Sequence, residues 1–530
     1  MNRYILSGIA LPLDSSADEA ADAARARLAR AGIRTEALSL FRKSVDARRK
    51  SDIRLVYSFS FEVPRPLRPE TVQKLGLRAA ASDLLSVRYG TAPLPARPVV
   101  VGMGPCGLFA ALLLAEHGYR PIVLERGDCM AARIRAVEHF YTSGQLDENS
   151  NIQFGAGGAG TFSDGKLVTR INDAHCAFVL SRLHSFGAPR EILTLAKPHI
   201  GTDILRNVVQ NIADEITRRG GEIHYRTPLV SFDMPQNACR RLRTKSGDLN
   251  AGVLVLAVGH SARDTYKMLL DGGFSLSPKD FSVGLRIEHR KADIDRALYG
   301  DFAGHPKLPY AEYNLSANTK ARGVYTFCMC PGGEVVAGAS EQGGLCVNGM
   351  SNFARDGENS NSAVCVSVYK SDYGATPAAA IEFQRGLERA AFTAGGGDFS
   401  APVSTLGDFL GGTSGAGYSR IRPTYMGGRV RTANLRALFP AALGDTLAGG
   451  ICAFGKKLPG FDCPDALLTG VETRTSAPVR ILRTDAFTMP GADDIYPGGE
   501  GAGYAGGITS AAVDGVKIAL RIMSRFRPFE

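Results

Sequence analysis

One stretch of the chain, from residue 98 to residue 125, constrains the fold more than any other. The apolar run RPVVV is followed by GMGPCG from Gly102, by the apolar helical pattern CGLFAALLLAEHG, and by a second apolar run, PIVLE, which ends at Glu125. Buried strand, glycine turn, helix and buried strand in this order begin a parallel α/β sheet. The glycines let the backbone approach a phosphate, and the helix N-terminus presents free N–H groups to it.

The acidic residue at the end of the second strand completes the pattern of a nucleotide site. Glu125 lies 23 residues after Gly102, where its carboxylate can accept hydrogen bonds from the ribose hydroxyls of an adenosine. This glutamate favours the ADP half of FAD or NAD over NADP. The predicted cofactor-binding residues of this unit are Gly102, Gly104, Pro105, Cys106, Gly107, Glu125 and Arg126.

A second copy of the G-x-G-x-x-G pattern, GAGGAG from Gly155, stands in a different context. It follows polar NSNIQF and leads into TFSDGKL, so no buried strand precedes it and no helix is indicated after it. We expect either a tight loop that brings backbone close to a flat ring or a pyrophosphate, or an ordinary surface loop. Under the first interpretation the candidate contacts are Gly158, Ser163, Asp164, Gly165 and Lys166.

A third copy, GAGYAG from Gly501, precedes an amphipathic helix expected to begin near Ile508. In glutathione-reductase-type flavoproteins a similar late segment closes over the ribityl chain, and the resemblance implies that Glu500 binds a ribityl hydroxyl. VLVLAVGHSARD from Val253 resembles the strand and glycine turn that returns to the nucleotide in those proteins, and GGEIHYRTPLVSF resembles their adenine-side strand. These segments add Gly259, Glu500, Gly501, Gly503, Gly506 and Ile508 to the predicted contacts.

The chain as a whole resembles a bacterial family of uncharacterised FAD-dependent dehydrogenases. The resemblance is carried by KSVDARRKSDI, VVVGMGPCGLFAA, FGAGGAGTFSDGKL, AVGHSARD, FCMCPGG, TGVETRTSAPVRI and GGEGAGYAGGITSAAVDG. It implies FAD as cofactor and an α/β fold: a discontinuous glutathione-reductase-type Rossmann FAD domain, an inserted α+β substrate domain and a small N-terminal α+β module. The expected boundaries are 1–90 for the module, 97–268 and 441–530 for the FAD-binding domain, and 269–440 for the inserted domain.

Candidate catalytic side chains lie mostly outside the glycine loops. Lys166 could place a cation near the flavin or a bound anionic substrate, with Asp164 orienting it, and His289 could shuttle a proton. Cys328 and Cys330 alternate on a predicted strand, where they would face the same side and could exchange electrons with a flavin. Each also has a structural interpretation: a solvated lysine, a satisfied core histidine and two small core residues.

The leading hypothesis is an FAD-dependent oxidoreductase that moves a hydride between flavin and a small-molecule substrate or NAD(P)H. No second complete strand, glycine turn and helix unit exists for a nicotinamide nucleotide, so NAD(P)H would bind transiently. Alternatively, electrons would come from another protein or from the substrate. A second hypothesis is a flavoprotein that serves RNA modification or electron delivery through its N-terminal module. A third is a structural FAD that neither nicotinamide reduces.

Charge and cysteine usage set the remaining expectations. Residues 1–90 carry 16 Lys or Arg against 10 Asp or Glu, hence +6 of the chain's net charge of +10. Their densest basic run, residues 42–50, could meet nucleic acid or an acidic partner protein, or be a solvated face. Ten cysteines without C-x-x-C pairs, and no apolar run of membrane-spanning length, predict a cytoplasmic protein without a metal site or membrane contact.

Overall fold

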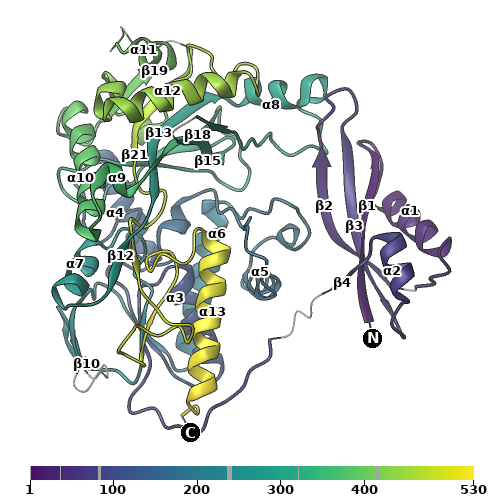
Figure 1. Cartoon of the computed structure of the whole chain (residues 1–530), viewed down its shortest axis with the longest axis horizontal. Helices are drawn as coiled ribbons and strands as arrows, with labels where there is room; N and C mark the ends of the chain where they lie inside the picture. Colours follow the sequence, from purple (N-terminus) through teal and green to yellow (C-terminus); the bar gives the residue numbers. More distant parts are fainter. Residues whose placement is uncertain are drawn as a thin grey trace.

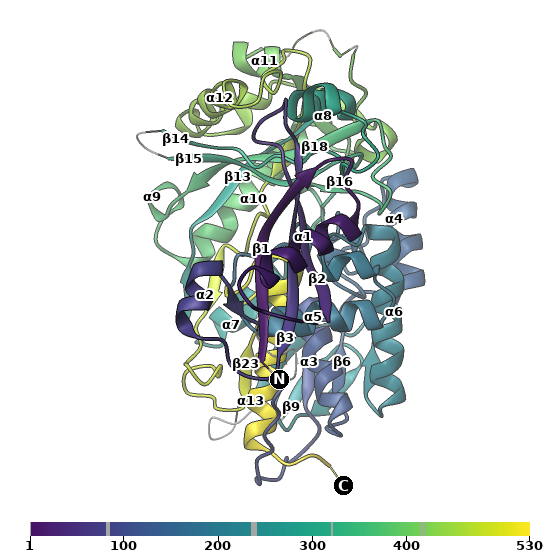
Figure 2. The same cartoon turned by 90° about the vertical axis from the view of Figure 1, so that its right-hand side faces the viewer.

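In the computed structural model, three main sheets divide the chain into a small N-terminal module and two larger domains (Figure 1). The structure describes residues 2–35, 37–80, 85–234, 241–319, 322–413, 415, 417–418 and 420–529. The module stands to one side of the body, and Figure 2 shows its strands in front of the two domains. No helix among these residues is long and apolar enough to cross a membrane.

The N-terminal module is an antiparallel sheet of order β2-β3-β1-β4 with two helices. Alternation along β3 buries Leu55, Tyr57 and Phe59 in the module's own core, as a half-buried strand requires. The elements are β1 (Asn2–Pro12), α1 (Ala17–Ala29), β2 (Leu38–Asp46), β3 (Arg54–Val63), α2 (Pro69–Leu75) and β4 (Arg78–Ala79). The module is therefore a separate small α+β unit.

The module joins the body through the edge strand β2. Lys43 donates its N–H to Thr194 O at 2.7 Å and accepts from the N–H of Ala196 at 2.9 Å, so a short body segment extends the module's sheet. In the basic run, Arg42, Arg48 and residues 49–50 are exposed. Binding of nucleic acid or a partner protein by this run stays a prediction.

The first domain is built on a five-stranded parallel sheet of order β23-β11-β5-β6-β7, which confirms the predicted parallel, Rossmann-like sheet. Its central strands are wholly apolar because both faces are covered: one by helices α3, α6 and α13, the other by the small sheet β8-β9-β10. The strands are β5 (Val99–Val101), β6 (Ile122–Leu124), β7 (Glu222–His224), β8 (Leu229–Asp233), β9 (Arg241–Thr244), β10 (Gly247–Asn250), β11 (Leu254–Leu256) and β23 (Ile495–Pro497). The helices are α3 (Pro105–Glu116), α4 (Met130–Ser143), α5 (His175–Ser185), α6 (Thr202–Arg218), α7 (Arg263–Asp271) and α13 (Ile508–Arg525).

The second domain is a seven-stranded mixed sheet of order β14-β15-β18-β13-β21-β19-β20, with a hairpin β16-β17 beside it. The strands are β13 (Phe281–Arg290), β14 (Ser316–Asn318), β15 (Gly323–Cys330), β16 (Glu334–Ala337), β17 (Val347–Met350), β18 (Asn359–Val368), β19 (Ala401–Thr405), β20 (Val430–Thr432) and β21 (Leu467–Glu472). The helices are α8 (Lys291–Tyr299), α9 (Lys370–Tyr373), α10 (Pro377–Ala394), α11 (Leu406–Gly411) and α12 (Ala441–Gly455). Two crossing segments, β12 (Leu276–Pro278) and β22 (Val479–Ile481), pair antiparallel between the domains.

The predicted end of the inserted domain at residue 440 is wrong. Helix α12 packs against β14, β15 and β18, and β21 pairs with β13 in the second sheet. The second domain therefore extends to about residue 475, and the chain returns to the first domain through β22. Residues 441–475 carry helix and strand patterns that fit either domain, and only the long-range pairing of β21 decides between them.

Candidate functional site

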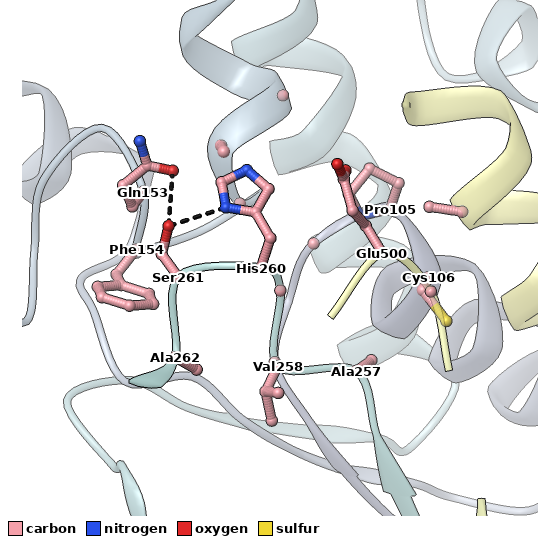
Figure 3. A pocket seen from close by; sticks show the side chains of 18 of the residues that line it. Pro105, Cys106, Gln153, Phe154, Ala257, Val258, His260, Ser261, Ala262 and Glu500 are labelled. Atoms are coloured by element: carbon pink, nitrogen blue, oxygen red, sulfur yellow. Dashed lines mark hydrogen bonds between the residues drawn. The ribbon is translucent and has the colours of Figure 1, made fainter. Parts of the chain in front are cut away.

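A pocket lies outside the carboxyl ends of the parallel strands β5, β6 and β11, where open α/β sheets bind their ligands (Figure 3). The Gly102 loop, the Gly155 loop, the turn at Gly259 and the segment around Glu500 all line it. The second domain adds Phe327, Cys328, Asn348, Arg474 and Thr475. Four segments that are distant in the sequence thus meet at one cavity between the domains.

The glycines of the first loop have different tasks. Gly102 has φ +98°, and a Cβ there would overlap Ala257 O, while a Cβ at Gly107 would overlap Gly102 O. Both are therefore required by backbone packing, and Gly107 lies off the pocket wall. Gly104, with Pro105 and Cys106, lines the pocket, and the nearest heavy atom to a Cβ built on it is Gly158 Cα, at 3.9 Å. Gly104 thus leaves room for a ligand rather than for protein.

The Gly155 loop is buried and held from within, so the surface-loop interpretation does not hold. The guanidinium of Arg133 is fully buried and donates to the carbonyls of Asn151, Ile152, Ala156 and Gly158 at 2.7 to 3.0 Å. A charged fork that bonds four carbonyls fixes the course of the loop. Sequence reasoning missed Arg133, because an arginine in an amphipathic helix gives no sign of such a partner.

Glu125 organises the pocket wall. Its carboxylate accepts hydrogen bonds from the N–H groups of Met103, Gly127 and Gly155, each at 2.9 Å. A carboxylate has about four lone-pair positions, so the predicted bond to a ribose competes with bonds that join three loops. Arg126 beside it pairs with Asp264 at 2.5 to 2.7 Å and stacks over Phe154, 4.4 Å from the ring centroid.

The Glu500 segment supplies a second helix N-terminus. Gly507 precedes α13 without a side-chain cap, and Ile508 lines the pocket. Burial raises the pKa of Glu500 to about 7, so its carboxyl group can donate as well as accept near neutral pH. The predicted contacts Gly501, Gly503 and Gly506 lie off the pocket wall, and Gly498, Gly499 and Gly507 line it instead. Gly501 packs against Gly259 and Gly503 against Arg480.

Lys166 sits at the seam between the domains, in a cluster of charges. Its Nζ donates to Met329 O and lies 3.7 Å from Asp164 Oδ2 and 3.6 Å from Glu312 Oε1. Asp164 itself accepts from Arg355, with Nε to Oδ1 at 3.0 Å. The predicted pairing of Asp164 with Lys166 is therefore shared with an arginine of the second domain.

Two neighbours of Lys166 differ in their relation to the pocket. Ser163 lines it. Gly165 lies off the wall with φ +66°, and a Cβ there would come 2.9 Å from Gly201 N. Gly165 therefore serves the turn rather than a ligand.

Contrary to the prediction, the two cysteines of β15 face different sides. A bulge between Phe327 and Cys330 interrupts the register with β18, and Cys328 has φ +46°. Cys328 therefore lines the pocket, whereas Cys330 is 1% exposed in the core. Both thiols are free, and burial raises the pKa of each, that of Cys330 to about 12. A protonated thiol is a poor nucleophile, so the geometry does not favour the redox interpretation.

His289 lies inside β13, away from the pocket. Its Nε2 is 2.8 Å from Phe461 O, its ring packs 4.9 Å from the Phe461 ring, and burial lowers its pKa to about 4. The structural interpretation of this histidine fits better than proton transfer to a substrate.

His260 is a pocket residue that sequence reasoning missed. Its Nδ1 is 2.9 Å from Ser261 Oγ, which donates to Gln153 Oε1 at 3.3 Å (Figure 3). Burial, and then the positive charges of Arg474 and Arg263, lower its pKa to about 3. Its position directly after Gly259, at the carboxyl end of a buried strand, is the feature that could have pointed to it.

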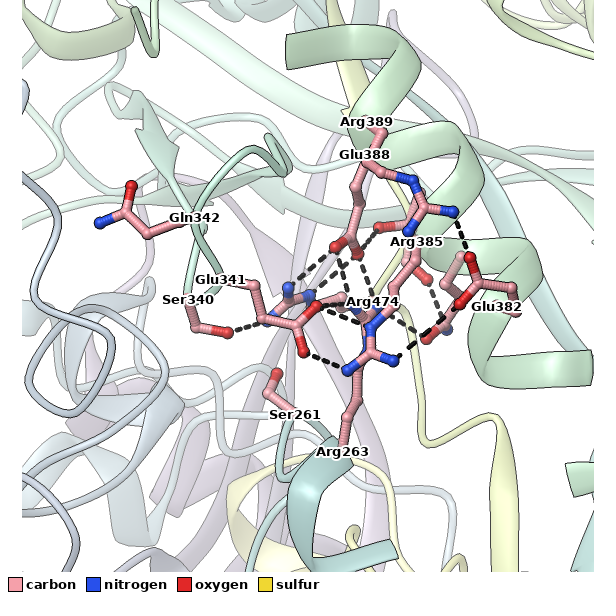
Figure 4. A network of polar contacts seen from close by, with 12 residues as sticks. Ser261, Arg263, Ser340, Glu341, Gln342, Glu382, Arg385, Glu388, Arg389 and Arg474 are labelled. Carbon is pink, nitrogen blue, oxygen red and sulfur yellow. Dashed lines mark hydrogen bonds and ion pairs between the residues drawn. The ribbon is translucent and has the colours of Figure 1, made fainter. Parts of the chain in front are cut away.

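A buried ionic network joins the two domains beside the pocket (Figure 4). Glu388 of α10 accepts from Arg263 of α7 at 2.7 and 2.8 Å and from Arg474 at 2.9 and 3.0 Å. Burial alone raises the pKa of Glu388, but the two guanidinium groups lower it well below its usual range. Glu341 adds pairs to Arg263 and Arg385 at 2.7 Å. The pocket wall at Arg474 is thus fixed by paired charges.

Comparison with known proteins identifies relatives over most of the chain. A family model described as "FAD-dependent protein, C-terminal domain-like" matches residues 280–475, the span of the second domain. An uncharacterized protein of Clostridium beijerinckii is 44% identical over 494 residues, which cover 92% of each chain. A 15-cis-phytoene desaturase of Arabidopsis thaliana is 37% identical over 92 residues, 17% of this chain and 15% of that protein.

Solved structures that resemble the chain include L-proline dehydrogenase from P. horikoshii, with 12% identity, coverage of 81% of this chain and 94% of that one, and a TM-score of 0.35. Glycine oxidase from Geobacillus kaustophilus has 11% identity, coverage of 84% and 97%, and a TM-score of 0.33. The relationship to the clostridial protein and the family-model match show that this chain belongs to the family of FAD-dependent proteins.

Proposed function

We propose that this protein is an FAD-dependent oxidoreductase that binds FAD in the pocket between its two domains and acts on a small molecule. The observation that carries this proposal is the meeting of two uncapped helix N-termini, those of α3 and α13, at one pocket. Such ends carry partial positive charge and free N–H groups. They suit a ligand that has a pyrophosphate at one place and an electron-accepting ring at another.

The chemistry of the wall fits a dinucleotide. Gly104 and Gly158 both line the pocket without side chains and lie so close that a Cβ built on Gly158 would come 2.9 Å from Gly104 Cα. Their bare backbone allows phosphate oxygens to approach. Arg126 and the remaining capacity of Glu125 would border the adenosine, and Glu500 would bind a ribityl hydroxyl. The N-terminus of α13 would face the ring system.

The second domain would supply the substrate side. Bound FAD supplies two-electron hydride chemistry. Cys328 and Asn348 line the pocket from the second domain, and the Lys166 side chain, 24% exposed, reaches it from the seam. Together with the positive end of α13, the Lys166 ammonium would stabilise negative charge on a bound group. Anaerobic titration with NADH and NADPH distinguishes a substrate from transiently bound NAD(P)H as the source of that group.

The test is the visible spectrum of the purified protein, followed by anaerobic titration with NADH and with NADPH. A yellow protein that one nucleotide bleaches supports an oxidoreductase with that donor. A yellow protein that neither nucleotide reduces favours a substrate-reduced enzyme, a protein electron donor or a structural FAD. An apoprotein that is colourless and takes up no FAD would contradict the proposal.

A further inference from the structure

A directional chain of hydrogen bonds fixes the proton on His260. The side-chain amide of Gln153 donates through Nε2 to Gly338 O at 3.0 Å, so its Oε1 is the end that accepts. Ser261 O–H donates to that Oε1 at 3.3 Å. A hydroxyl has one proton, so Ser261 Oγ must accept from His260 Nδ1 at 2.9 Å. The ring proton of a neutral His260 therefore sits on Nδ1, and Nε2 carries a lone pair.

The surroundings of His260 keep its ring neutral. The charged groups that act on it come from several elements: Arg263 of α7, Glu388 of α10, Arg474 after β21 and Lys279 after β12. Three of these four are cations, and burial also disfavours a charged imidazole. His260 therefore cannot serve as a cationic partner for a phosphate, and its free nitrogen is an acceptor.

The free nitrogen is open to the cavity. In the part of the chain that the structure describes, Nε2 of His260 makes no hydrogen bond, and this nitrogen is not fully buried. The side chain lines the pocket between the Gln153 side and the Glu500 side (Figure 3). An imidazole acceptor held in one tautomer at a pocket wall is a group built to receive a proton donor.

We propose that His260 Nε2 accepts a hydrogen bond from a hydroxyl or ring N–H of bound FAD. The proposal rests on the proposed function. FAD is favoured over a second molecule because His260 directly follows Gly259, in the first-domain wall that holds the other predicted nucleotide contacts. The chain of bonds ends at Gly338, after β16 of the second domain. The acceptor is therefore held in place only when the two domains are packed together.

Two substitutions separate the nitrogens of the ring. His260→Asn keeps a donor near the Nδ1 position and has no group at the Nε2 position, whereas His260→Gln can place its amide oxygen there. We expect His260→Asn to weaken FAD binding about tenfold, the effect of one lost hydrogen bond, and His260→Gln to stay within about threefold of the wild type. The measurement is titration of full-length apoprotein with FAD, followed by flavin fluorescence.

Each other outcome overturns the inference. If the wild type and both variants bind FAD with equal affinity, His260 makes no hydrogen bond to FAD. If both variants lose FAD affinity equally, the ring has a packing role. If FAD affinity is unchanged but NADH or NADPH reduces His260→Asn more slowly, the hydrogen-bond donor belongs to a second molecule and not to FAD. Nitrogen-15 NMR of histidine-labelled apoprotein tests the tautomer directly, since a proton on Nε2 would break the chain of bonds. Failure of the wild type to bind FAD would contradict the proposed function itself.

Discussion

The two walls of the pocket differ in how much backbone and how many side chains they expose to the cavity. The first-domain wall exposes much bare backbone, at glycines 102, 104 and 158 and at the N-termini of α3 and α13, beside side chains such as Glu125 and His260. The second-domain wall consists of side chains, and Arg474 in it is anchored by the buried pair with Glu388. Backbone N–H groups recognise a phosphate whatever the neighbouring side chains are, whereas a side-chain wall can change with the substrate.

This difference teaches where each part of the function is encoded. A backbone wall suits a constant ligand such as a cofactor, and the residues that form it belong to short local sequence motifs. A side-chain wall sets specificity through residues that fold and pairing bring together. The two walls should therefore respond differently to substitution, the first in cofactor affinity and the second in stability or turnover.

The largest effect is expected from Glu388→Gln. Loss of this carboxylate leaves the buried guanidinium groups of Arg263 and Arg474 without their shared counter-ion, so we expect unfolding free energy to fall by about 3–5 kcal/mol. Glu382→Gln on the same helix is the control, since its pair with Arg389 is half exposed and is worth at most about 1 kcal/mol. Urea unfolding measures both, and equal effects would show that the network does not hold the second wall.

Gly104→Ala tests the backbone wall. The added methyl meets no protein atom closer than Gly158 Cα at 3.9 Å, so we expect thermal stability near the wild type. FAD affinity should fall about 100-fold, or about 2.7 kcal/mol, because the methyl takes the space of the phosphate. Gly449→Ala, at an exposed glycine of α12 with open space around it, should leave FAD affinity unchanged and raise stability by at most about 1 kcal/mol. An unstable Gly104→Ala protein would contradict the assignment of Gly104 to ligand space.

Within the first wall, the sequence predicted the local units, because the contacts that form them are close in the sequence. The unit from residue 98 to residue 125 folds as expected, and α13 begins at Ile508. Within that wall, however, the pattern alone could not separate Gly104, which faces the cavity, from Gly107, which faces the backbone of Gly102. Both are required by the motif, for different physical reasons.

The second wall was largely beyond prediction because it depends on distant pairings. The end of the second domain follows from the pairing of β21 with β13, and the place of Cys328 follows from a bulge against β18. In the first wall the same holds for Arg133, whose carbonyl partners in the Gly155 loop are at least 18 residues away in the sequence. No periodicity or motif in a single sequence records such contacts.

Lys166→Met tests the seam between the walls. Without the ammonium, negative charge on a group bound beside Lys166 loses a stabilising cation, so we expect flavin reduction to slow by about 30-fold, or about 2 kcal/mol, with FAD affinity unchanged. Lys197→Met is the matched control, since Lys197 also pairs with Glu312, at 3.7 Å, but its side chain is 62% exposed. Anaerobic stopped-flow with the donor found by titration measures the rate, and similar rates in both variants would place Lys166 outside the chemistry.

The smallest effect concerns Glu500 and pH. Burial raises the pKa of Glu500 from 4.5 to about 7 and that of Glu472 likewise to about 7, so between pH 4.5 and 7 the native state holds protons that the unfolded state has released. Each of these two groups then lowers the stability of the apoprotein by about 1.4 kcal/mol from pH 6 to pH 8, whereas His260 and His289, whose pKa values burial lowers, act in the opposite direction. Glu500→Gln should change the difference in unfolding free energy between pH 6 and pH 8 by about 1.4 kcal/mol relative to the wild type, measured by urea unfolding at both pH values. An unchanged pH dependence would mean that Glu500 is ionised and solvated, and that the first wall presents a carboxylate rather than a carboxylic acid to its ligand.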